Sequence, residues 1–161
     1  MKTVRFLAFV LASILLNGCV TLKAPITTKN ESIEKYKYIF ISPTGSLTSA
    51  SGFAHGSQHY SAIKSVNPYD VVAGILAKEG FVILPELRPE LIDETLIVNY
   101  GESGRRNVAG GIGYTIEVTI QFISAKSYKL ISSCTAEGIG DTEADDIRKA
   151  ITRCLSALFS K

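Results

Sequence analysis

Apolar and polar residues alternate most regularly over residues 114–122. Apolar side chains occupy every second position from 114 to 122, and threonine, glutamate and glutamine stand between them. Successive side chains of a β-strand point to opposite faces of the sheet. The period therefore predicts a strand with one face on a core and the other toward water.

Four further segments are short, apolar and rich in β-branched or aromatic residues, which is typical of strands. These predicted strands cover residues 36–41, 81–84, 95–100 and about 128–136. Residues 124–127 read Ser-Ala-Lys-Ser and are expected to form the turn of an antiparallel hairpin.

Two helices are predicted from apolar positions at helical spacing and from their end signals. Asn67 can cap the first helix, Pro68 suits its first position, and Gly80 follows its end. The second helix is expected from about Thr142 to Phe159, with Asp141 or Thr142 as its cap and one apolar stripe along its length.

The order of predicted elements is β-α-β-β-β-β-α. It predicts an α+β fold, with a mostly antiparallel sheet of about five strands and two helices on one face. Residues 43–66 and 101–113 are rich in glycine and serine and lack a lasting period, so both are expected to be long loops.

The first residues have the organisation of a secretory signal. Lys2 and Arg5 precede an apolar run over residues 6–16, and a small residue, Gly18, stands before Cys19. A helix over this run would be about 16 Å long, against a bilayer core of about 30 Å. The run is therefore too short to span a membrane as a helix.

The segment from Leu16 to Cys19 resembles the lipobox of bacterial lipoproteins. The resemblance implies that Cys19 receives acyl chains and that residues 1–18 are removed as a signal peptide. By the same resemblance, Val20 in place of aspartate implies an outer-membrane lipid anchor, and the lack of an acidic cluster after Cys19 implies a domain facing the periplasm. The alternative is an ordinary signal peptide in which Cys19 occurs by chance.

Residues 19–35 are polar after the cysteine and are predicted to be a tether, followed by a single domain over residues 36–161. Removal of the signal takes away Lys2 and Arg5 and leaves as many basic as acidic residues. No basic stripe remains, which argues against nucleic acid as a partner. The expected partners are the membrane, through Cys19, and envelope proteins.

Cys134 and Cys154 are the cysteines left for the domain. Both are expected to face the layer between the sheet and the closing helix, and the envelope is oxidising, so they are predicted to form a disulfide. Two buried free thiols are the alternative.

Candidate contact residues are few. His55 and His59 have the spacing of a helical metal site, but glycines between and around them make a helix unfavourable, and no metal is expected. Arg105 and Arg106 follow Gly101 and Gly104, where backbone amides and guanidinium groups could hold an anion. No cofactor motif is present, and no activated nucleophile or acid–base pair can be nominated.

The Asn67–Phe81 helix and strand, Thr95–Tyr100, Tyr114–Phe122 and the closing helix through Leu158 together resemble small bacterial outer-membrane lipoproteins of unknown function. More distantly, they resemble the α/β domains of TolB-type and CsgG-type envelope proteins. The resemblance implies an envelope accessory or assembly role. The anchor, the compact domain, the two long loops and the absence of a catalytic set lead us to expect a non-enzymatic accessory or protein-interaction domain. Two alternatives stay open: a small-ligand or anion-binding module using residues 43–66 and 101–113, and a hydrolase of envelope polymers with a convergent carboxylate pair.

The lipobox makes a direct prediction. Cys19→Ser should abolish incorporation of labelled fatty acid and leave the precursor unprocessed, because the acyl acceptor is lost. Labelling of the variant at the level of the parent would exclude Cys19 as the acceptor.

Overall fold

The computed structural model describes residues 21–55, 58–108 and 113–160, and residues 51–62 only as backbone. The predicted signal peptide, residues 1–18, and Cys19 lie outside the described residues. No helix in the described ranges is long and apolar enough to cross a membrane.

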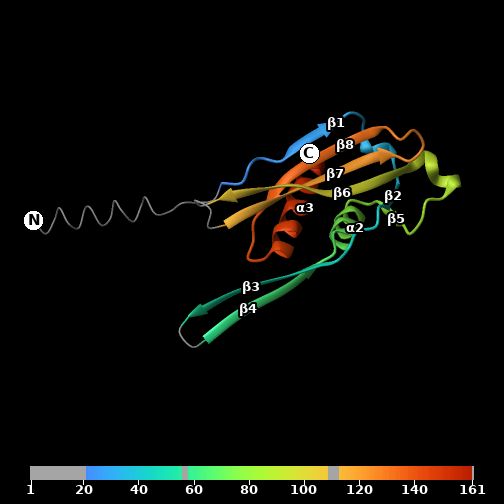
Figure 1. The fold of residues 1–161 in the computed structure, drawn as a ribbon. Coiled ribbons are helices and arrows are strands. Elements are labelled where there is room, and N and C mark those ends of the chain that lie inside the picture. Colours follow the sequence, from blue (N-terminus) through green and yellow to red (C-terminus); the bar gives the residue numbers. More distant parts are fainter. Residues whose placement is uncertain (1–20, 56–57, 109–112, 161) are drawn as a thin grey trace, which may run out of the picture.

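A six-stranded sheet forms one layer of the fold, in the order β1-β8-β7-β6-β2-β5 (Figure 1). Its strands are β1 (Ile26–Lys29), β2 (Tyr38–Ile41), β5 (Val82–Leu84), β6 (Thr95–Val108), β7 (Gly113–Ser124) and β8 (Leu130–Gly138). β2 runs parallel to both β5 and β6, whereas β6, β7, β8 and β1 pair antiparallel. The α+β class is confirmed, but the sheet is mixed and has one strand more than predicted.

The helices α2 (Pro68–Lys78) and α3 (Glu143–Phe159) lie on the same side of this sheet (Figure 1). Their starts follow the sequence signals: the side chain of Asn67 accepts from the amide of Tyr69, and that of Thr142 accepts from the amide of Asp145. Gly80, after α2, has φ of +94°, which a glycine adopts without strain. Two short 3-10 helices, η1 (Ile33–Lys35) and η2 (Pro89–Glu94), complete the helical elements of the described residues.

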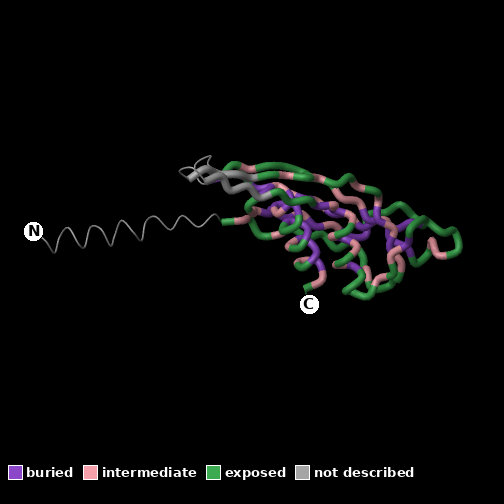
Figure 2. The backbone as a smooth tube through the Cα atoms, turned by 90° about the horizontal axis from the view of Figure 1, so that it is seen from below, coloured by how far each residue is buried: buried purple, intermediate pink, exposed green. Residues whose placement is uncertain are grey.

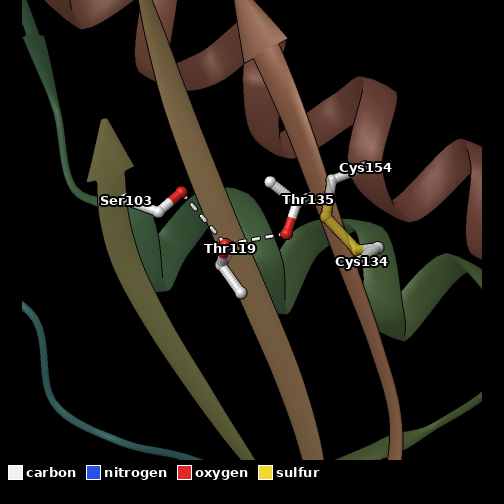
Figure 3. The surroundings of a disulfide bond; sticks show 5 residues. All are labelled: Ser103, Thr119, Cys134, Thr135 and Cys154. Carbon is white, nitrogen blue, oxygen red and sulfur yellow. Dashed lines mark hydrogen bonds between the residues drawn. A yellow bond between two sulfur atoms is a disulfide. The ribbon is translucent and has the colours of Figure 1, made fainter. Parts of the chain in front are cut away.

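The core fills the layer between the sheet and the helices, where buried positions concentrate (Figure 2). Ile120 and Phe122 from β7 meet Ile151 and Leu155 from α3, and all four are fully buried. The predicted disulfide is present here: Cys134 on β8 is bonded to Cys154 on α3, with 5.4 Å between their Cα atoms (Figure 3).

β8 and α3 also touch backbone to backbone. A Cβ atom added at Gly138 would lie 1.9 Å from the carbonyl oxygen of Asp146 and 2.6 Å from the amide nitrogen of Ala150. Only a residue without a side chain fits that gap. Gly138 therefore sets how closely the closing helix approaches the sheet.

Three segments differ from the sequence predictions. Most of residues 43–66, predicted as a loop, forms the two-stranded hairpin β3 (Leu47–His55) and β4 (Gln58–Val66), which extends away from the main sheet (Figure 1). The strand predicted over residues 95–100 continues to Val108, and therefore takes in most of the predicted loop at 101–113. Ile26–Lys29, placed in the predicted tether, pairs with β8 instead.

These errors share a physical reason. Serine, threonine and glycine give no hydrophobic period, yet their backbone groups can pair across strands like those of any other residue. The hairpin, the extension of β6 and β1 are each held by such ladder bonds.

Replacement of Gly138 tests the close contact between β8 and α3. Gly138→Ala should lower the free energy of unfolding by about 1–3 kcal/mol or more, because the added methyl forces strand and helix apart. Gly101→Ala is the matched control, since its added Cβ meets no atom within 4 Å. Urea unfolding of both variants measures the difference, and equal stability would show that α3 can shift without cost.

Candidate functional site

The sheet face opposite the helices carries an apolar area at one end. Ile39, Leu96 and Phe122 belong to the core, so their strand neighbours point to the other face. Six such residues, from β5, β2, β6, β7 and β8, make up what we call the open-face patch: Tyr38, Phe40, Val82, Ile97, Ile123 and Leu130. Val82 is 45% exposed and Leu130 36%, and the other four are partly exposed.

The same face becomes polar farther along the strands. Thr119 donates to Ser103 at 3.0 Å and shares a 2.8 Å hydrogen bond with Thr135, which links β6, β7 and β8 (Figure 3). Ser103 in turn donates to Glu117 at 2.9 Å. The prediction that Glu117 and Thr119 lie on the polar face is confirmed.

Arg105 and Arg106 lie next to each other on β6 and therefore point to opposite faces. Arg105 is paired with Glu143 at the start of α3, and its guanidinium lies 5.2 Å from the centre of the Tyr114 ring. Arg106 donates to both carboxylate oxygens of Glu137, at 2.8 and 2.7 Å. Each arginine already has an anionic partner within the chain.

Glu137 is the centre of a cluster that sequence reasoning missed. Its side chain is 3% exposed. The hydrogen bonds from Arg106, which outweigh desolvation, hold its pKa at about 2, well below the usual range. The available signal was that Glu137 is the one charged residue in β8, because a lone charge in a half-buried strand needs a partner.

The cluster also holds the beginning of the described chain. The amide of Lys23 donates to Glu137 at 3.0 Å, and Arg106 donates to the carbonyl of Thr21 at 3.2 Å. Arg153, on α3, donates to the carbonyls of Glu137 and Lys23, the latter at 2.8 Å. We call Arg106, Glu137 and Arg153 the N-terminal clamp.

Asp146 is a second buried carboxylate, at the start of α3. Its side chain is almost wholly buried and one oxygen, Oδ1, has no hydrogen-bond partner. Desolvation raises its pKa to about 6, against an opposing backbone hydrogen bond from Gly140.

The structure describes the two histidines only through their backbone. His55 on β3 pairs with Gln58, and His59 on β4 pairs with Ala54, so the two lie across the hairpin rather than on one helix face. Their side chains lie outside the description. Among the described residues, no three histidine, cysteine or acidic side chains gather as metal ligands would.

An open hollow of about 970 Å³ lies elsewhere, between the β1–β2 connection and the end of α3. Its lining includes the aromatic residues Tyr36, Phe81 and Phe159 and the charged residues Lys29 and Glu31. Arg105 and Arg106 are not among its lining residues.

The chain resembles known proteins in its structure and not in its sequence. No family model matches the chain, and no curated protein sequence matches it. A structure of the PelC dodecamer from Paraburkholderia phytofirmans in space group P6 is 13% identical with a TM-score of 0.47, over 85% of this chain and 97% of that chain. A structure of a single-substitution variant of the same dodecamer in space group C2 is 14% identical with a TM-score of 0.48, over 83% and 95% of the two chains.

The raised pKa of Asp146 predicts a pH dependence of stability. The unfolded carboxyl has a pKa of about 3.9, so the folded state binds the proton more tightly and stability falls as pH rises from about 4 to about 6. Asp146→Asn removes this loss and should raise the melting temperature near neutral pH, with little change near pH 4.

Asp141→Asn is the matched control, because it removes an exposed carboxylate from the same turn. Thermal melts across this pH range check the prediction. Parallel pH profiles for the parent and Asp146→Asn would contradict it.

Proposed function

We propose that the chain is a lipid-anchored protein of the bacterial envelope, attached through Cys19 to the outer membrane and facing the periplasm. Its domain binds a protein partner and catalyses no reaction. The observation that supports this function best is the open-face patch, an apolar area on the sheet face that neither α2 nor α3 covers.

The composition of the patch suits a protein interface. Aromatic residues are enriched at the centres of such interfaces and charged residues are depleted there. Tyr38 and Phe40 supply the aromatic groups, and the remaining four members are aliphatic. Partly exposed apolar residues gathered on one face, rather than scattered singly, are typical of interaction sites.

The polar residues beside the patch complete the arrangement of an interface. Gln121 precedes Ile123 on the same face of β7, and the hydroxyl row of Ser103, Thr119 and Thr135 lies next to it. An apolar centre with a polar border is the usual anatomy of a protein–protein contact.

The anion-binding alternative has less support. It relied on Arg105 and Arg106 in an open loop, whereas both lie in β6 and are paired with Glu143 and Glu137. A free anion would have to compete with these carboxylates.

The hydrolase alternative required two converging carboxylates. The two carboxylates with strongly shifted pKa values are Glu137, bound by Arg106 on the open face, and Asp146, buried on α3 at the helix side. Because the sheet lies between them, these two carboxylates do not form the converging pair that a hydrolase needs. This favours a binding domain over a hydrolase.

Substitutions in the patch test the proposal. Val82→Lys and Leu130→Lys place charges on its most exposed members, which are 45% and 36% exposed, so the fold should persist. Capture of partners by crosslinking in cells should fall about tenfold or more, because an interface centre tolerates an unpaired charge poorly.

Ile63→Lys is the matched control, because it places the same charge on an apolar residue that is 71% exposed on β4, outside the main sheet, and it should leave capture unchanged. Circular dichroism verifies folding of all three variants. Undiminished capture by both patch variants would exclude the open face as the interface.

A further inference from the structure

The described residues before β2 are bound to the domain. The sequence predicts a tether over residues 19–35, but the contacts of the N-terminal clamp begin at Thr21 and β1 begins at Ile26. We propose that the N-terminal clamp fixes the anchored domain upright on the bilayer, with Lys23 and Arg153 against anionic phospholipid headgroups. This inference relies on the lipid anchor at Cys19 that belongs to the proposed function.

The reach of the chain supports this orientation. Two residue steps separate Cys19 from Thr21, and extended chain spans at most about 3.6 Å per residue. The clamp end of the domain must therefore lie within about 7 Å of the acylated residue. A free tether over residues 19–35 would allow a reach of more than about 50 Å and no preferred orientation.

The clamp closes on the segment from two sides. Arg106 reaches Thr21 from β6, and Arg153 reaches Lys23 from α3. Between them, buried Glu137 accepts from the backbone amide of Lys23. If the segment left, a buried carboxylate and two guanidinium groups would lose hydrogen-bond partners, which is unfavourable for charged groups.

The charge of this end suits an anionic surface. Three cations, Lys23, Arg106 and Arg153, lie next to Glu137, and Glu117 is the partner of Glu137 on the neighbouring strand, so these five residues have a net charge of +1. Arg153 has no ion pair with any carboxylate in the described part of the chain, and Lys23 is 63% exposed. Basic residues close to a membrane are attracted to anionic headgroups within about a Debye length.

The orientation gives the open-face patch its position. Ile97 in the patch and Arg106 in the clamp lie on the same strand, nine residues apart. At about 3.3 Å per residue along the strand, the patch stands up to about 30 Å farther from the bilayer than the clamp. The domain would thus hold the patch at its end away from the lipid, where a partner can reach it.

Fluorescence quenching tests the orientation, because the chain contains no tryptophan. A single reporter is introduced by Tyr114→Trp at the clamp end or by Tyr128→Trp in the β7–β8 turn at the opposite end, both at exposed positions. The full-length lipidated protein is reconstituted in vesicles of phosphatidylethanolamine and phosphatidylglycerol that carry a headgroup spin label.

Quenching should be several-fold stronger at position 114 than at position 128. It should weaken at position 114 when phosphatidylcholine replaces the anionic lipid or when salt is raised. Arg106→Gln combined with Arg153→Gln should bring the two positions close to equality, because the segment is released. Lys149→Gln is the matched control: it removes a cation that binds the carbonyl of Ile139 at the same end and does not touch the segment.

The outcomes separate the two proposals. Protein that fails to float with the vesicles would refute the anchor, and with it the proposed function. Floating protein with equal quenching at both positions would refute the upright orientation alone. An unchanged difference in the Arg106 and Arg153 variant, with folding verified by circular dichroism, would show that the clamp does not set the orientation.

Discussion

The contact between β8 and α3 holds the sheet and the closing helix together and sets the direction of every side chain on β8. Gly138 lets the strand and the helix meet backbone to backbone, and the Cys134–Cys154 bond fixes them four residues away along the same strand. Because side chains alternate along β8, Cys134 and Gly138 face the helix while Thr135 and Glu137 face the other way. One strand thereby joins the closing helix on one face and the N-terminal segment on the other.

The two faces of the sheet therefore differ in what they contact. The helix face forms the core, which includes the disulfide. The open face combines an apolar patch at one end with a hydroxyl row and the Glu137 cluster at the other. Since the long strands β6 and β7 run through both ends, an orientation fixed at the clamp also fixes the position of the patch.

The arginines illustrate how tertiary contacts redefine a candidate site. In the sequence, Arg105 and Arg106 are two cations among glycines and suggest an anion site. In the fold, the alternation of β6 directs Arg105 to Glu143 on α3 and Arg106 to Glu137 on β8. Their charges serve internal pairing, whereas Arg153 donates to two backbone carbonyl groups.

Regular elements and the disulfide could be predicted from the amino-acid sequence. The period of residues 114–122 predicted β7, Asn67-Pro68 and Asp141-Thr142 predicted the helix starts, and the positions of Cys134 and Cys154 predicted their bond. The fold was needed to reveal the β3–β4 hairpin, the pairing of β1 with β8 and the cluster around Glu137. These features rest on backbone ladders and ion pairs between residues far apart in the chain, and polar segments carry no hydrophobic period that reveals such partners.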